Sequence, residues 1–331
     1  MGDQNTKKAL VTGASGFLGS HLCKILIEKG YKVSALVRKT SDLSRLKNLP
    51  IHYYYGSLQD IASLALAVKE KDYVFHSAGL IVAKGRAEYF KGNVEGTKKL
   101  LEIITEKNPN LKRFVYVSSL AAGGPSDGGV GNIESLRPHP ITFYGESKLA
   151  GEIETLRFKD WLPVSVIRPP AIYGPSDKPT FNFFKVAKWG VIPVFGKKDT
   201  YLSITHVRDV VEALILAAEK DEAKGEVFYV SDGEINTWKR IWEIMCEAAG
   251  KKGRVIRIPL SMFFFIAKTS EIISKIFGKP SMLNYHKAID LTQSWALDIS
   301  KIQTKLGFKP IYSLQKGTKE TFEWYKNSGW L

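Results

Sequence analysis

Short β-branched runs alternate with amphipathic stretches through the first two-thirds of this chain of 331 residues. Strand and helix repeated in this order predict a parallel, doubly wound sheet with helices on both faces. The run RFVYVSS is apolar almost throughout, which suits a strand buried on both faces. The predicted fold class is α/β. The predicted strands cover residues 8–13, 32–38, 51–56, 73–78, 113–119 and 164–170, with helical patterns such as 17–30 and 92–107 between them.

The first predicted strand leads into the helix through the glycine-rich turn TGASGFLG. Gly13 permits a tight turn, Gly16 lets a phosphate approach the backbone, and Gly19 lets helix and strand pack closely. The N-terminus of the helix then presents free N–H groups to a pyrophosphate. The spacing is G-x-x-G-x-x-G rather than G-x-G-x-x-G. A dinucleotide is therefore the predicted ligand, held also by the intervening Ser15, Phe17 and Leu18.

The alternation loosens after about Asp177. We predict an NAD(P)-binding Rossmann domain over 1–176, which residues 201–232 rejoin. The remainder, 177–331, is predicted to be mainly a smaller substrate-binding lobe.

The end of the second predicted strand bears on the choice of cofactor. NAD sites usually place an acid there for the ribose 2′-OH, whereas a cation accommodates a 2′-phosphate. Arg38 and Lys39 occupy this place, and the first acid is Asp42. These cations favour NADP, although a pair of solvated surface charges would look the same and NAD stays possible.

Tyr144 and Lys148 stand four residues apart in the segment YGESK, so on a helix they share one face. An isolated tyrosine has a pKa of about 10, too high for a base near neutrality. A nearby ammonium favours phenolate, so Lys148 is predicted to lower the pKa of Tyr144. Together with a dinucleotide site, such a tyrosine indicates hydride transfer at an alcohol or ketone.

Seven motifs occur in the order typical of extended short-chain dehydrogenases/reductases, which the chain resembles along nearly its whole length. The family contains dehydrogenases, reductases, epimerases and dehydratases, so the resemblance indicates the fold more firmly than the reaction. The motifs are TGASGFLG, VFHSAG, NVEGT, FVYVSS, YGESK, RPPAIYGP and HVRDVVEA.

The resemblance implies a role for each matching residue. Tyr144 would be the general acid/base, Lys148 would tune it and bind the nicotinamide ribose, and Ser119 would hold the reacting oxygen. Asn93 matches a family asparagine, with a helix cap or structural hydrogen bond as an equal alternative. Further cofactor contacts are implied at Leu58, Ser77, Ala78, Gly79 and Pro170; Ser57 replaces the acid usual before Leu58. His76 is predicted to be a buried structural histidine, and His206 to begin a helix.

Two departures from the sugar-nucleotide epimerase pattern favour a less charged substrate. Ala171 and Leu202 stand where those enzymes typically carry an asparagine and an arginine that face the diphosphate. The segment RPPAIYGP and residues 291–310 look closer to the 3β-hydroxysteroid dehydrogenase and dihydroflavonol reductase side of the superfamily. This resemblance implies an NADP(H)-dependent oxidoreductase that acts on a fairly apolar, steroid- or dihydroflavonol-like alcohol or ketone. A nucleotide-sugar epimerase or dehydratase with tightly bound NAD is the alternative, and a non-catalytic NADP-binding scaffold a third. Aromatic side chains of the second lobe could line an apolar pocket or form a second core.

Composition bounds the remaining expectations. The net charge of +15 usually reflects a solvated surface, with an anionic ligand or a negatively charged membrane as the alternative. No nucleic-acid-binding motif is present. Only two cysteines and no signal peptide or metal-ligand spacing are found, so a cytoplasmic protein without a metal is expected. The apolar segment 259–279 lies in a basic region and is read either as a helix packed on the core or as a peripheral membrane contact or substrate cover. A homodimer is implied only by the resemblance.

Overall fold

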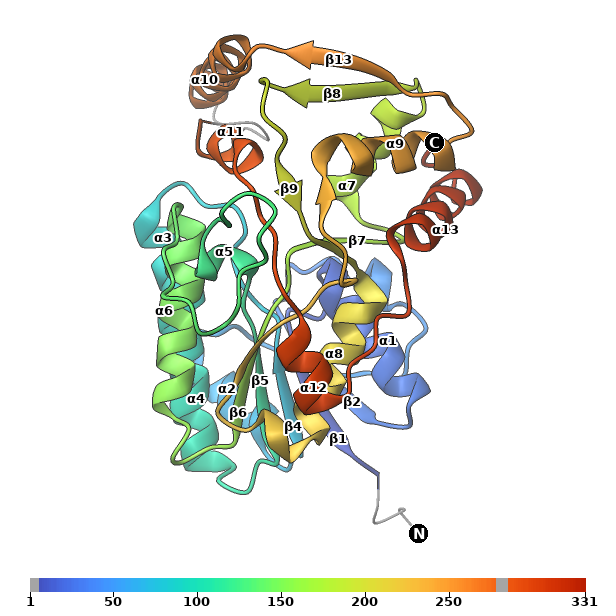
Figure 1. Ribbon diagram of the computed structural model, residues 1–331. Coiled ribbons are helices and arrows are strands. Elements are labelled where there is room, and N and C mark those ends of the chain that lie inside the picture. The colour runs from blue at the N-terminus through green and yellow to red at the C-terminus, as the bar shows by residue number, and fades with distance from the viewer. Residues whose placement is uncertain (1–5, 278–284) are drawn as a thin grey trace.

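A seven-stranded parallel sheet forms the centre of the molecule in the computed structural model, which describes residues 6–277 and 285–331 (Figure 1). The strand order is β11-β6-β5-β4-β1-β2-β3. From β1 the chain adds strands outward to one side (β2, β3) and then to the other side (β4, β5, β6), as expected of a doubly wound sheet. The strands are β1 (Lys8–Thr12), β2 (Lys32–Val37), β3 (His52–Tyr55), β4 (Tyr73–His76), β5 (Arg113–Val117), β6 (Val164–Arg168) and β11 (Val227–Tyr229).

The predicted α/β fold is confirmed, and the strands β1 to β6 each lie within one of the six predicted runs. All residues of β4, β5 and β6 are buried, because helices cover both faces of the sheet. Val11 of β1 pairs in register with Ala35 on one side and Phe75 on the other. The carboxyl ends of β1 and β4 therefore lie together at one edge, where sheets of this kind bind ligands.

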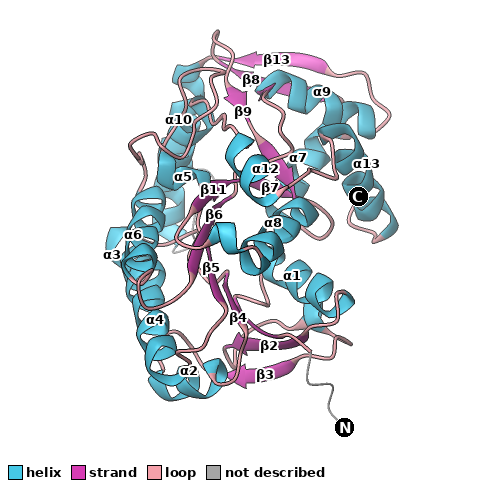
Figure 2. Ribbon diagram, turned by 60° about the horizontal axis from the view of Figure 1, so that its bottom comes forward, coloured by secondary structure: helices cyan, strands magenta, loops and turns pink. Residues whose placement is uncertain are grey.

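Two layers of helices sandwich this sheet (Figure 2). One layer contains α1 (Phe17–Glu28), α8 (Val207–Glu219) and α12 (Ser300–Leu306), which pack their apolar faces on β1, β2 and β5. The opposite layer contains α2 (Ile61–Val68), α4 (Gly96–Lys107) and α6 (Phe143–Arg157). A turn of π-helix at Lys91–Glu95 precedes α4. Short helices lie at η1 (Ser44–Leu46), α3 (Arg86–Phe90), α5 (Leu120–Gly123) and η3 (Asp221–Ala223).

The second lobe lies above the carboxyl edge of the sheet (Figure 1). It carries a parallel ribbon of β8 and β13, while small pairs β7–β10 and β9–β12 connect the two lobes. Its elements are β7 (Ala171–Tyr173), α7 (Lys178–Ala187), β8 (Val191–Phe195), β9 (Tyr201–Leu202), β10 (Ile204–His206), β12 (Asn236–Thr237), α9 (Trp238–Ala248), β13 (Arg254–Ile258), α10 (Leu260–Phe277), α11 (Tyr285–Thr292) and α13 (Leu314–Asn327).

Aromatic side chains of this lobe form a second core rather than a pocket wall. Phe184 is fully buried, and Phe181 packs edge-on against Trp330 and at a tilt against Tyr325. Phe183 meets Trp238 and Trp242 in the same cluster. Of the two expectations for these aromatics, the packed core holds for this cluster.

An extended segment, residues 293–298, ties the two lobes together. Asn132 forms a parallel bridge with Leu297, and Leu202 forms one with Trp295. The side chain of Asn132 also donates to the carbonyls of Gly124 and Pro125, at 3.1 and 3.2 Å. The long loop before α6 is thereby held by a part of the chain that follows it by more than a hundred residues.

Within residues 6–277 and 285–331, no helix is long and apolar enough to cross a membrane. In the same residues, no group of acidic, histidine or cysteine side chains has the arrangement of a metal site. Both cysteines are buried free thiols.

Candidate active site

The glycine turn between β1 and α1 makes two close approaches that exclude a side chain. Gly13 has a φ of +74°, and a Cβ added there would lie 2.7 Å from the amide nitrogen of Ala78. A Cβ on Gly19 would lie 2.2 Å from the carbonyl oxygen of Gly13. The turn therefore presses its backbone against both the end of β4 and the start of α1. Only glycine fits this geometry, as the sequence predicted.

The start of α1 suits an anionic group. Gly16 precedes the helix, no side chain caps it, and its first turn contains no acidic residue. The first N–H groups of a helix have no partner within the helix, and its dipole favours negative charge there. Gly16 is exposed and Ser15 and Phe17 are partly exposed, whereas Leu18 and Gly19 are buried. A pyrophosphate fits this turn through backbone N–H groups and not through side-chain charge.

Beneath the turn, a buried chain of hydrogen bonds fixes the end of β4. The Nδ1 atom of His76 lies 2.7 Å from the Thr12 hydroxyl, and its Nε2 lies 2.9 Å from the Thr97 hydroxyl. Burial lowers the pKa of His76 to about 3, and the charge of Lys148 acts in the same direction. The ring is therefore neutral at ordinary pH and holds the loop Ser77–Gly79 in place. This is the structural histidine that the sequence predicted.

Asn93 is occupied by structural hydrogen bonds. Its Oδ1 accepts from the amide of Leu80 at 2.6 Å, and its Nδ2 donates to the carbonyl of Leu80 at 3.0 Å and to the Ser147 hydroxyl at 2.9 Å. The side chain thus binds the loop after Gly79 to α6. Of the two alternatives for Asn93, the structural hydrogen bond is the one this geometry displays.

Tyr144 lies in the first turn of α6, beside Ser119. Thr142 caps this helix by accepting from the amide of Gly145 at 3.1 Å, so the tyrosine is at a well-defined helix start. Ser119 follows β5 and caps the short helix α5. Burial raises the pKa of Tyr144, and a hydrogen bond with the Ser119 side chain opposes the rise. The phenol is therefore protonated near neutral pH and can act as a proton donor.

Lys148 lies one turn further along α6 and is only 4% exposed. Its ammonium donates to the carbonyl of Val117 at 2.6 Å and lies 4.4 Å from the centre of the Tyr116 ring. A Cβ on Gly79 would be 3.6 Å from the same nitrogen, so the ammonium lies beside the cofactor loop. Burial lowers the pKa of Lys148 to about 7. The predicted lowering of the Tyr144 pKa by this lysine is wrong for the structure as it stands, since burial is the main influence on that pKa and raises it.

A buried ion pair behind Lys148 is part of the site that sequence reasoning missed. Glu152 accepts two bonds from Arg168, at 2.8 Å to Nε and 2.6 Å to Nη2, and also accepts from the Ser118 hydroxyl. Arg168 in turn donates to Tyr229 at 3.2 Å. The charge of Glu152 counteracts the lowering of the Lys148 pKa by burial. The spacing of Glu152 four residues after Lys148 was the available signal.

The other predicted cofactor residues lie along the same edge of the sheet. Arg38 and Lys39 follow β2 and are exposed, and neither takes part in an ion pair among the described residues. Leu58 follows β3 and packs against the start of α4 near Gly96. Pro170 is buried in the link between β6 and β7. Ser77 and Ala78 are partly exposed beside the glycine turn, and Gly79 is exposed.

Tyr89 lies beside Tyr144. The two rings lie 6.1 Å apart, and the Tyr89 hydroxyl donates to the carbonyl of Ile81 at 3.2 Å. An ion pair at 2.8 Å between Arg86 and Glu146 holds α3 against the first turn of α6. Burial raises the pKa of Tyr89, and the charge of Asp290 in α11 adds to this shift. Helix α11 therefore lies on the same side as Tyr89.

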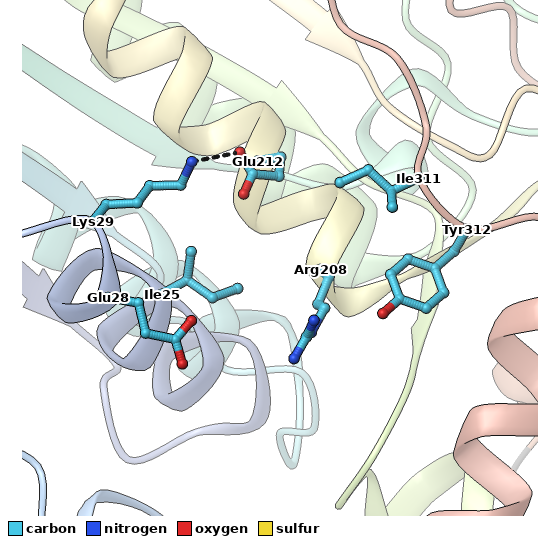
Figure 3. Close-up of a pocket in the computed structure, with 7 residues that line it drawn as sticks. All are labelled: Ile25, Glu28, Lys29, Arg208, Glu212, Ile311 and Tyr312. Carbon is cyan, nitrogen blue, oxygen red and sulfur yellow. Dashed lines mark ion pairs between the residues drawn. The ribbon is translucent and has the colours of Figure 1, made fainter.

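The pocket drawn in Figure 3 lies elsewhere, between α1, the start of α8 and the loop before α13. It has a volume of about 200 Å³, and an ion pair at 3.1 Å joins Lys29 and Glu212 at its wall. These elements cover the face of the sheet opposite α6 (Figure 1). The pocket is therefore separate from the group around Tyr144. Its lining residues are Ile25, Glu28, Lys29, Arg208, Glu212, Ile311 and Tyr312.

Comparison with known proteins agrees with this geometry. A sequence profile described as "NAD dependent epimerase/dehydratase family" matches residues 9–231. The chain is 29% identical over 325 residues to a ceramide reductase of Caulobacter vibrioides, covering 97% of this chain and 95% of that protein. It is also 29% identical over 339 residues to a 3 beta-hydroxysteroid dehydrogenase/Delta 5→4-isomerase of Mycobacterium tuberculosis, covering 96% and 90%.

Among solved structures, the chain resembles UDP-glucose 4-epimerase of Thermotoga maritima, determined with UDP-glucose. The two superpose with a TM-score of 0.78 at 25% identity, over 97% of this chain and 99% of that one.

Proposed function

The chain belongs to the NAD-dependent epimerase/dehydratase family, and on that premise we propose that it is an NADP(H)-dependent oxidoreductase of a fairly apolar secondary alcohol or ketone. The observation that carries this proposal is the pairing of Tyr144 with Ser119 beside a glycine turn shaped for a dinucleotide. A proton donor and a second hydroxyl at one point can bind the oxygen of a carbonyl group. That arrangement suits carbonyl reduction.

The cofactor fits the residues present. Gly13 and Gly19 let the turn pack closely on Ala78 and on its own backbone, and the exposed Gly16 leaves the uncapped start of α1 open to a phosphate. When bound, a reduced nicotinamide would supply the hydride. The exposed Arg38 and Lys39 would meet a 2′-phosphate with two cations where an NAD site usually has an acid, which supports NADP.

Three side chains of the protein would bind the substrate oxygen and transfer its proton. Ser119 would hold the substrate oxygen as negative charge develops on it, and Tyr144 would donate its proton to that oxygen. Lys148, with a pKa of about 7, would restore the proton or stabilise the phenolate once its ammonium turns from Val117. Because burial keeps the phenol protonated, the resting site holds the proton that ketone reduction requires.

An apolar substrate agrees with what surrounds the site. Ala171 and Leu202, which replace the expected diphosphate partners, lie in β7 and β9, and neither offers a side-chain donor. Exposed apolar residues Ile81 and Val82 follow the cofactor loop on the side of Tyr89. The names of two relatives specify a ceramide and a 3β-hydroxysteroid, which are both lipids. We extend that class of substrate to this chain.

A nucleotide-sugar epimerase is the second candidate, favoured by the likeness to the structure determined with UDP-glucose. Such an enzyme would oxidise and reduce the same tightly held NAD in each turnover. It would release NAD on denaturation and show no net loss of NADPH absorbance.

The test is a comparison of the wild-type protein with Tyr144→Phe. We expect net NADPH consumption with apolar ketones, and a fall in kcat of about 10²–10⁴-fold in the variant with little change in NADPH affinity. Tyr312→Phe, on the opposite face of the sheet, is the matched control and should retain activity. Equal losses of affinity and rate would mean that Tyr144 only binds, and cofactor binding with no activity to lose would indicate a scaffold.

A further inference from the structure

Helix α10 presents an apolar stripe to solvent. Its inner face is covered, because Phe263 and Ala267 pack against α11 and the ribbon of β8 and β13. Its outer face is not covered by other parts of the described chain: Phe265 is 71% exposed and Ile272 is 52% exposed. We call this set the α10 stripe: Met262, Phe265, Ile266, Ile272 and Ile273, which recur at steps that keep them on one side of a helix.

Exposed basic residues accompany the stripe. Residues 251–279 contain seven basic residues and one acidic residue, Glu271. Arg254 and Arg257 lie in the strand before α10, and Lys268 lies on the helix itself; all three are exposed. None of the three takes part in an ion pair among the described residues. An apolar stripe flanked by exposed cations is complementary to an apolar layer beneath anionic groups.

The position of α10 relates it to the site. Helix α10 packs on α11. The charge of Asp290 in α11 contributes to raising the pKa of Tyr89. The ring of Tyr89 lies 6.1 Å from that of Tyr144. Both views place α10 on the same side of the molecule as α3 and α6 (Figures 1 and 2). A surface that contacted the α10 stripe would thus lie on the side of the molecule that carries α3 and α6, the helix of Tyr144.

We propose that the α10 stripe and its basic neighbours dock the protein on an anionic lipid surface. The apolar side chains would enter the boundary of the acyl chains, and Arg254, Arg257 and Lys268 would meet the headgroups. The helix would lie in the plane of the surface and not cross it. This docking does not depend on the proposed reaction, since it requires neither Tyr144 nor cofactor.

The experiment is cosedimentation of the full chain with two kinds of vesicle, at low and at high salt. One kind is phosphatidylcholine alone, and the other is phosphatidylcholine and phosphatidylglycerol in equal parts. We expect binding to the anionic vesicles that salt weakens, because screening shortens the reach of exposed charges. Neutralising Arg257 and Lys268 as Arg257→Gln and Lys268→Gln should weaken binding about fivefold for each. Phe265→Ser should weaken it about tenfold or more.

Leu66→Ser is the matched control, because Leu66 is a similarly exposed apolar residue on α2 of the other lobe. It should leave vesicle binding unchanged, and Tyr144→Phe should do the same. Binding to neither vesicle, equal binding to both, or equal binding by Phe265→Ser and the wild type would overturn the proposal. A dimer that Phe265→Ser dissociates, in a protein that does not bind vesicles, would also overturn it, because the stripe would then be a contact between two copies.

Discussion

Removing the carboxylate of Glu152 tests whether the buried ion pair supports the site. Glu152 and Arg168 are 2% and 5% exposed at their side chains, and two bonds of 2.8 and 2.6 Å join them. The change Glu152→Gln keeps the size of the side chain but leaves the guanidinium buried without a counter-charge. Breaking a buried pair on one side typically costs about 3–5 kcal/mol. We expect a loss of that size in the free energy of unfolding.

Glu154→Gln is the control, two residues further along the same helix. Glu154 pairs with Arg157 at 2.6 Å, but Arg157 is 66% exposed, so this pair contributes only about 0–1 kcal/mol. Urea unfolding followed by tryptophan fluorescence measures both losses. Replacing the pair together, as Glu152→Met with Arg168→Leu, should recover much of the single loss because no buried charge remains. Equal losses for Glu152→Gln and Glu154→Gln would refute the reasoning.

The same variant has a consequence for Lys148. Burial lowers the pKa of this lysine to about 7, and the charge of Glu152 opposes the lowering. Without that charge the pKa falls further, so Lys148 loses its proton at a lower pH. The alkaline limb of the pH profile of kcat/KM for ketone reduction should therefore move to lower pH in Glu152→Gln. A profile that does not move would show that Lys148 acts independently of the pair.

Three further predictions follow from the site. Because the pKa of His76 is about 3 when folded, against about 6.5 unfolded, its contribution to stability is complete above about pH 6.5 and is lost as the pH falls toward 3. Between those two pH values, the free energy of unfolding of His76→Gln should fall less steeply with decreasing pH than that of the wild type, by up to about 1.4 kcal/mol per pH unit. The same slope in both proteins would contradict a low pKa for the buried His76. Gly13→Ala forces a side chain into a φ of +74° and against Ala78, so it should cost about 1–2 kcal/mol and weaken cofactor binding in a fluorescence titration; full affinity would argue against the cradle. Replacing both cations as Arg38→Ala with Lys39→Ala should weaken NADPH binding about tenfold or more while leaving NADH binding nearly unchanged, and equal effects on the two would oppose the preference for NADP.

Much of the fold could be predicted because its signals are local. Each buried strand is a short β-branched run, and each glycine of the turn stands between a strand and a helix, so neighbouring residues suffice to recognise them. Tyr144 and Lys148 were placed on one helix face by their spacing alone. The histidines His76 and His206 were also assigned correctly, as a buried structural ring and as a helix cap.

Contacts between distant segments could not be predicted in this way. Neither the capture of the Lys148 ammonium by Val117 nor the pairing of Glu152 with Arg168 follows from the residues next to them. The same holds for the segment 293–298, which holds the loop before α6. These contacts depend on how sheet and helices pack, and they decide the protonation of the site.

The amino-acid order by itself determined an alternating α/β chain, a backbone cradle at Gly13 and a tyrosine one helical turn from a lysine. Periodicity and glycine spacing carry that information, since both act through adjacent residues. Only the tertiary structure decided how burial shifts the pKa values of the tyrosine and the lysine, and which apolar side chains stay exposed to solvent. Packing buries the Tyr144 site and the Phe184 core but leaves Phe265 in solvent, because burial depends on what the rest of the chain brings to each face.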